Sequence, residues 1–141
     1  MSIEQINPTI AAERMKDAGH PATYLDVRTV EEYEAGHPAG AYNVPVMVRD
    51  ETGQMGPNPN FQRDVEKLFP KNKKLVVGCM AGGRSQRACQ ILQTGGYESL
   101  ANVQGGFGGA RDPSGQIVVK GWSQEGLPVE DGNPPGRAYT A

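Results

Sequence analysis

The sequence predicts a single α/β domain whose parallel sheet is covered by helices on both faces. Short runs of β-forming residues alternate with segments of helical periodicity, which is typical of a parallel sheet. One run, Leu75-Val76-Val77, is apolar throughout, as expected of a strand buried on both faces. The length of 141 residues suits one compact domain, and the sequence shows no obvious internal repeat.

Capping residues mark the elements in chain order. Asn7 followed by Pro8 is typical of a helix start, and Thr29 with Glu32 has the spacing of a capping box. Asn60 is a third candidate cap. The expected elements are a helix that Gly19 ends, a strand at 23–27, a helix that Gly36 ends, a strand at 41–44, a loop at 49–59, a helix after Asn60, a strand at 75–77, a helix that Gly95 ends, a strand at 99–103 and a small strand at 117–119.

The C-terminal segment is rich in residues that interrupt regular structure. It contains Asn133-Pro134-Pro135-Gly136 and no apolar periodicity. We therefore expect the domain to span residues 1–128 and residues 129–141 to form a flexible tail.

Composition excludes several classes of function. The net charge of -2 and the lack of a basic run predict neither nucleic-acid binding nor binding to acidic membranes. The sequence has no apolar run of about 18 residues that would indicate a transmembrane helix, and the N-terminus does not resemble a signal peptide.

With two cysteines and two histidines at no ligand-like spacing, we expect no disulfide framework, no metal site and no cofactor. The small number of cysteines predicts a reducing cytoplasm as the compartment.

The stretch from Cys79 to Ser85 joins the buried strand to a helix and is the candidate catalytic loop. In open α/β sheets, ligands bind at the carboxyl ends of the strands, which is where Cys79 lies. Gly82 and Gly83 allow a tight turn whose N–H groups point inward, and Arg84 adds a positive charge beside the helix N-terminus. These groups favour the thiolate, so Cys79 is predicted to be a catalytic nucleophile.

Other chemically interesting residues receive mostly structural interpretations. Asp26 and Arg28 end a strand and are candidate supporting residues in the same crevice, although such residues more often fix loops. Cys89 is expected mid-helix, where a thiol usually packs as a small apolar group. His37, within a Gly-His-Pro turn, is expected to anchor that turn rather than act as a base.

Several ordered segments resemble the rhodanese family of sulfurtransferases. The resemblance is strongest to short, single-domain members, including plant senescence-associated and bacterial types. One departure is that Gly108 to Gly121 intervene between the later glycine pair and the tryptophan. The matching segments are Leu25-Asp26-Val27-Arg28 with Glu32-Tyr33, the stretch from Gly36 to Pro45, Cys79 to Ser85, Gly105-Gly106, Trp122 and Gly126-Leu127-Pro128.

The resemblance implies a central five-stranded parallel sheet and ping-pong sulfur transfer through a Cys79 persulfide. The implied donor is thiosulfate or a small persulfide such as glutathione persulfide, and the implied acceptor is cyanide or a thiol. Backbone amides of the loop would hold the persulfide, and Arg84 would help to bind the anionic donor. The implied substrate-binding residues are Met80, Ala81, Gly82, Gly83, Arg84 and Ser85.

Two alternatives stay open. Phosphatases and arsenate reductases of this general type place five residues between cysteine and arginine, whereas four separate Cys79 from Arg84. This shorter ring suits one sulfur atom better than a phosphate group, which favours sulfur transfer. The second alternative is a non-catalytic sulfur carrier or sensor that passes its sulfur to a protein partner.

Overall fold

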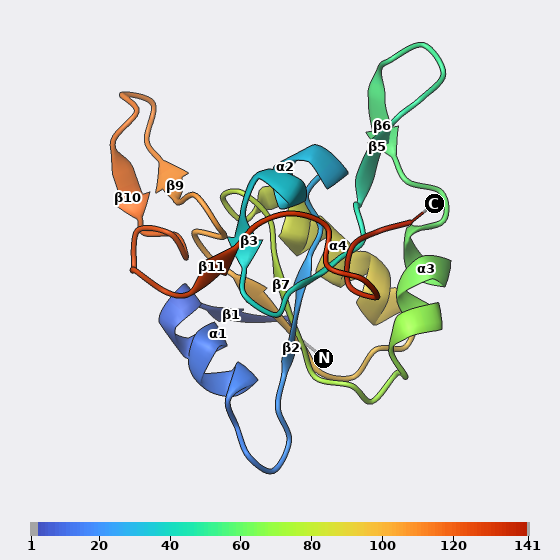
Figure 1. Cartoon of the computed structure of the whole chain (residues 1–141), viewed down its shortest axis with the longest axis horizontal. Helices are drawn as coiled ribbons and strands as arrows, with labels where there is room; N and C mark the ends of the chain where they lie inside the picture. Colours follow the sequence, from blue (N-terminus) through green and yellow to red (C-terminus); the bar gives the residue numbers. More distant parts are fainter. Residues whose placement is uncertain (1–2, 141) are drawn as a thin grey trace.

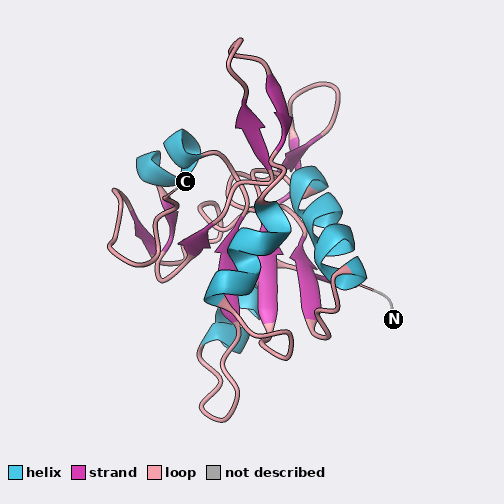
Figure 2. Ribbon diagram, turned by 90° about the vertical axis from the view of Figure 1, so that its right-hand side faces the viewer, coloured by secondary structure: helices cyan, strands magenta, loops and turns pink. Residues whose placement is uncertain are grey.

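The protein, described at residues 3–140 by a computed structural model, contains a five-stranded parallel sheet with helices on both faces (Figures 1 and 2). The order of strands is β1-β8-β7-β2-β4, which confirms the predicted fold class. The elements are β1 Glu4–Ile6, α1 Pro8–Met15, β2 Thr23–Asp26, α2 Val30–Ala35, β3 His37–Pro38, β4 Tyr42–Asn43, β5 Met47–Arg49, β6 Met55–Pro57, α3 Phe61–Leu68, β7 Leu75–Gly78, α4 Gly83–Thr94, β8 Leu100–Val103, β9 Ala110–Arg111, β10 Ile117–Val119 and β11 Val129–Glu130.

The centre of the sheet is β7, which pairs with β2 on one side and β8 on the other. In this register Gly78 lies opposite Asp26, and Val77 lies opposite Asn102. The three strands therefore end side by side, so the residue that follows Gly78 enters the crevice at their carboxyl ends.

Successive strand residues point to opposite faces of the sheet, which divides the core in two. On one face Leu25 packs in a cluster with residues of α3 and α4, whereas on the other Tyr24 packs with α1, Tyr33 of α2 and Trp122. Figure 1 shows α1 and α3 on opposite sides of the sheet. The helices thus bury both faces of the sheet, as expected for β7, which carries no polar side chain.

Two of the three predicted helix caps have the expected geometry. The Asn7 side chain accepts a hydrogen bond from the N–H of Ile10 at 2.9 Å. Thr29 and Glu32 form the predicted capping box at the start of α2. Asn60 makes no side-chain capping bond, which corrects the third prediction; instead, its own N–H donates to the Asn58 side chain at 3.0 Å.

Residues 49–59, expected to form a loop, are largely part of a β-hairpin. In it β5 pairs with β6 in antiparallel fashion, and the insertion at 108–121 forms a second hairpin of β9 and β10. Figure 1 shows both hairpins projecting from the same end of the molecule. The prediction missed the first hairpin because its strands are short and contain Gly and Pro.

The two hairpins have the same tip, a short sequence repeat that was not predicted. Arg-Asp-x-Ser/Thr-Gly-Gln occurs at 49–54 and again at 111–116. Asp50 Oδ1 accepts from the N–H groups of Thr52 and Gln54 at 2.8 and 3.0 Å. Asp112 Oδ1 makes the equivalent bonds to Ser114 and Gln116, both 3.0 Å. The aspartate therefore closes each turn from within.

The expected flexible tail instead packs back onto the domain. Its first residues form β11, which pairs with β3, and the chain then runs across the molecule to α3 (Figure 1). Arg137 Nη1 donates to the carbonyl of Ala41 at 3.1 Å, and the Tyr139 hydroxyl donates to Asp64 at 2.8 Å. These partners are distant in sequence, so local composition did not reveal them.

Candidate active site

Cys79 leaves β7 at the carboxyl edge of the sheet and lies inside its own loop. It is a free thiol whose side chain is buried, with 2% of its surface exposed. The N–H of Gly82 donates to Cys79 Sγ at 3.0 Å. Gly82 has a φ of 131°, which only glycine adopts without strain, and α4 begins at the next residue. The turn at Gly82 therefore brings a loop N–H group onto the sulfur.

A glycine pair behind this loop fixes the direction of its peptide groups. The carbonyls of Cys79, Met80 and Ala81 accept hydrogen bonds from the N–H groups of Phe107, Gly108 and Gly105 at 2.8, 2.9 and 3.0 Å. Gly106 comes so close that a Cβ there would lie 2.2 Å from the Cys79 carbonyl oxygen. The loop carbonyls are thus bonded from behind, which leaves loop N–H groups for an atom at its centre.

Arg84 does not point its charge freely into the loop. Its Nη1 and Nη2 donate to the two carboxylate oxygens of Glu32 at 2.7 and 3.1 Å. Burial raises the pKa of Glu32, but hydrogen bonds from Arg84 and the Thr29 backbone outweigh it and lower that pKa to about 2. The Glu32 carboxylate of α2 therefore compensates the Arg84 charge that was predicted to bind an anion. Arg84 still interacts electrostatically with Cys79.

Comparison with known proteins agrees with this geometry. The sequence model of the family described as Rhodanese-like domain matches residues 7–111 of this chain. The chain belongs to the rhodanese family.

Individual relatives agree in sequence and in structure. Thiosulfate sulfurtransferase 16 of Arabidopsis thaliana is 38% identical to this chain over 113 residues. The match covers 80% of this chain and 82% of that relative. The senescence-associated protein DIN1 of Raphanus sativus is 36% identical over 88% of this chain, which spans 60% of that relative's length. The crystal structure of Rv0390 from M. tuberculosis superimposes with a TM-score of 0.75 at 27% identity, covering 94% of this chain and all of that one.

In this rhodanese domain a row of polar side chains leads away from Cys79. Ser85 Oγ lies 3.4 Å from Cys79 Sγ, 3.1 Å from the Gly82 carbonyl and 2.5 Å from Asn102 Oδ1. Asn102 in turn donates to Gln5 at 2.9 Å, and Gln5 donates to Gln86 at 2.7 Å. Because Asn102 Nδ2 is engaged by Gln5, its oxygen faces Ser85 as an acceptor. The sequence predicted Ser85 alone, since β1, which carries Gln5, was not expected.

Asp26 and Arg28 form a buried ion pair beside the rhodanese loop. Both side chains are about 1–2% exposed, and Arg28 Nη2 donates to Asp26 Oδ2 at 2.8 Å. Arg28 also donates to the Gly36 carbonyl at 2.6 Å and lies 4.5 Å from the centroid of the Phe107 ring. These contacts tie β2 to α2 and to the segment after the glycine pair, which is a structural role.

Cys89 and His37 are held in structural positions. Burial, together with the nearby Cys79, raises the pKa of Cys89 to about 12, so this thiol is poorly suited to act as a nucleophile. The ring of His37 stacks on Tyr33 at 3.6 Å, and its Nδ1 lies 2.6 Å from the Tyr33 carbonyl. This side chain fixes the turn that begins β3.

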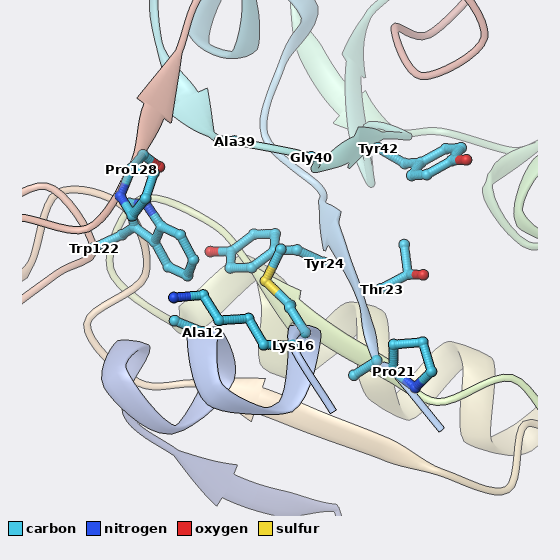
Figure 3. A pocket seen from close by; sticks show the side chains of 12 residues that line it. Ala12, Lys16, Pro21, Thr23, Tyr24, Ala39, Gly40, Tyr42, Trp122 and Pro128 are labelled. Carbon is cyan, nitrogen blue, oxygen red and sulfur yellow. The ribbon is translucent and has the colours of Figure 1, made fainter. Parts of the chain in front are cut away.

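A hollow of about 480 Å³ lies away from the Cys79 loop, on the α1 side of the sheet (Figure 3). It is lined mainly by apolar groups, among them Tyr24 and Trp122, whose rings meet edge to face at 5.5 Å. No residue of the loop from Cys79 to Ser85 lines it. Within residues 3–140, no group of three His, Cys, Asp or Glu side chains is placed to hold a metal ion, and no helix is long and apolar enough to cross a membrane.

Replacing Glu32 with glutamine is expected to speed sulfur uptake from thiosulfate about threefold, a change of under ~1 kcal/mol. Glutamine retains an oxygen for the Thr29 cap but releases the Arg84 charge toward the anionic donor. Because the folded-state pKa of Glu32 is lowered, its stabilisation is present above pH 4.5 and is lost as the pH falls towards 2.

Stopped-flow uptake and urea unfolding at several pH values test this expectation. The wild type should lose its stability advantage over Glu32→Gln between pH 4.5 and 2. Glu31→Gln, one position earlier on α2 and exposed, is the matched control and should change neither quantity. Slower uptake in Glu32→Gln than in Glu31→Gln would contradict the compensating role of Glu32.

Proposed function

We propose that this protein is a sulfurtransferase that moves sulfane sulfur through a persulfide on Cys79. The Cys79 thiolate attacks the outer sulfur of thiosulfate, the sulfur–sulfur bond of the donor breaks, and sulfite leaves with the bonding electrons. A small persulfide such as glutathione persulfide is an equivalent donor. A thiophilic acceptor, cyanide or a thiol, then removes the outer sulfur and regenerates the thiolate.

The observation that carries this proposal is the orientation of the loop's peptide groups. With the carbonyls of Cys79, Met80 and Ala81 bonded from behind, a sulfur atom at the loop centre meets N–H groups. The N–H of Gly82, at 3.0 Å from Sγ, is the first of them. Such donors stabilise negative charge on a terminal sulfur without a full cation. The relatives named thiosulfate sulfurtransferase support the same chemistry.

Phosphate or arsenate chemistry is less well supported. A tetrahedral oxyanion needs a wider ring and a free arginine fork, whereas four residues separate Cys79 from Arg84. The fork of Arg84 is occupied by Glu32. We also propose a reducing compartment such as the cytoplasm, in which both cysteines stay free.

Intact-mass measurement after incubation with thiosulfate tests the proposal. The wild type should gain one sulfur atom that cyanide removes as thiocyanate, whereas Cys79→Ser should gain none. Cys89→Ser is the matched control and should load like the wild type, because Cys89 is a packing residue. Absence of cyanide-labile sulfur in the wild type, or its presence in Cys79→Ser, would sink the proposal. Stable loading without turnover on small acceptors would instead identify a carrier.

A further inference from the structure

A groove of about 490 Å³ opens beside the catalytic loop, on the β8 side of the sheet. Ala81 and Gly82 of the loop contribute to its lining, as do Ala110 and Val119 of the hairpin formed by β9 and β10. The insertion that separates the glycine pair from Trp122 therefore builds part of a surface next to the loop that holds Cys79. Its volume lies within the range of about 300–1,000 Å³ for ligand sites and far exceeds the needs of one sulfur atom.

The base of the hairpin packs on the glycine pair that lies behind the catalytic loop. The N–H of Gly109 donates to the Gly105 carbonyl at 2.7 Å. A Cβ on Gly105 would lie 2.3 Å from the Lys120 carbonyl oxygen and 3.1 Å from Val119 Cγ1. The base of the hairpin is thus packed on the same glycine pair that bonds the loop carbonyls. The groove is consequently a fixed feature of the active-site edge.

The lining of this groove carries no charged side chain. Four of its residues are amides, Gln5, Gln86, Asn102 and Gln104. An amide side chain offers both a donor and an acceptor, which complements the N–H and C=O groups of a peptide. Three of these amides form the row that ends at Ser85 and Cys79. The polar groups are therefore ordered before any ligand binds.

We propose that the groove binds the sulfur acceptor, and that this acceptor is an extended, uncharged protein segment carrying a cysteine. The proposal rests on the sulfur transfer proposed above and names the acceptor class. The acceptor thiolate attacks the outer sulfur of the Cys79 persulfide. The bond between that sulfur and Sγ breaks, Cys79 leaves as a thiolate, and the acceptor becomes the persulfide. No external oxidant or reductant is needed.

Charge and shape favour a peptide over small acceptors. Cyanide is too small to use the amides or the apolar contacts with Ala110 and Val119. Glutathione carries two carboxylates and an ammonium group, which would lose water in a neutral groove without gaining an opposite charge. An uncharged extended segment pairs its backbone with the amides and places small side chains against the hairpin.

Single-turnover transfer from thiosulfate-loaded protein provides the test. The acceptors are cyanide, N-acetylcysteine methylamide, and N-acetylated, C-amidated Ala-Cys-Ala and Asp-Cys-Asp. We expect Ala-Cys-Ala to accept sulfur about tenfold faster than the single-residue thiol, at equal thiolate concentration, since ~1.4 kcal/mol of binding gives this ratio. Asp-Cys-Asp should lose the advantage. Equal rates for both uncharged thiols would overturn the proposal.

Variants of the hairpin separate the groove from a general effect on the loop. Val119→Glu puts a charge into the groove and should lower the ratio of Ala-Cys-Ala transfer to cyanide transfer about tenfold. Val118→Glu, on the same strand, is 61% exposed and does not line the groove, so this ratio should not change. Equal ratios in the two variants would contradict the assigned site.

Binding without chemistry makes the two proposals separable. Unloaded wild-type protein is titrated with the acetylated, amidated Ala-Ser-Ala peptide, and amide chemical shifts are followed by NMR. Shifts at the groove that Val119→Glu abolishes would support a peptide site even if thiosulfate loads no sulfur, an outcome that would refute only the sulfur transfer. Loading without peptide preference or peptide binding would refute only the groove.

Discussion

Asp26→Ala is expected to destabilise the protein by about 3–5 kcal/mol, because it leaves a buried arginine without its counter-charge. Arg28 is 1% exposed and receives two-point support from the Asp26 carboxylate. The other partners of this guanidinium, the Gly36 carbonyl and the Phe107 ring, carry no negative charge. Urea unfolding should show a large fall in the midpoint, with sulfur loading lost at the same denaturant concentration as the fold.

An exposed pair of similar geometry is the matched control. Arg14 and Glu4 also form a two-point contact, but their side chains are 39% and 55% exposed. Solvent screens such a pair, so Glu4→Ala should cost no more than about 1 kcal/mol. In the double variant Asp26→Ala/Arg28→Met, the unpaired charge is gone and part of the stability should return. Equal losses for Asp26→Ala and Glu4→Ala would refute the account based on burial.

The sequence predicted only part of the candidate site, because some of its contacts join residues that are far apart in the chain. The loop from Cys79 to Ser85 is local, so its glycines and its position between strand and helix predicted its form. The pairing of Arg84 with Glu32 joins residues 52 positions apart. The sequence pattern assigned Glu32 to a capping box and Arg84 to the loop that begins at Cys79. Neither pattern indicated that each would neutralise the other.

The same limit applies to elements whose partners are remote. The order of the helices and central strands followed from periodicity and caps, whereas β1 and β11 are short and exist because they pair with β8 and β3. Asn102 has the pattern of an ordinary strand residue, and only its neighbour Ser85 gives it a place in the site. The two hairpin tips were the exception. Their repeated residues are local and can be recognised in the sequence.

Gly78→Ala is expected to destabilise the protein by at least about 1–3 kcal/mol and to impair sulfur loading more than the loss of stability explains. A Cβ on Gly78 would lie 1.8 Å from the Tyr24 hydroxyl oxygen and 2.5 Å from Cζ of the same ring. The Tyr24 ring is 1% exposed and meets Trp122 edge to face at 5.5 Å, so we expect the end of β7 to move as well as the ring. That movement displaces Cys79, the next residue.

A double-mutant cycle with Tyr24→Phe isolates this contact. The buried Tyr24 hydroxyl finds no hydrogen-bond partner among the described residues, so its removal alone should be close to neutral or stabilising. In Gly78→Ala/Tyr24→Phe the nearest clashing atom is absent while Cζ remains. The double variant should therefore be more stable than Gly78→Ala and should load sulfur faster, without reaching the wild type.

Gly83→Ala is the matched glycine control. A Cβ there would meet no heavy atom within 4 Å beyond its chain neighbours and its own helix, and Gly83 begins α4 with a backbone conformation open to any residue. Alanine there should be neutral or stabilising by up to about 1 kcal/mol in unfolding experiments. If Tyr24→Phe fails to improve Gly78→Ala, the strain lies elsewhere in β7. Recovery would show that Tyr24, on the face of the sheet opposite α4, sets the position of Cys79 by excluding any side chain at Gly78.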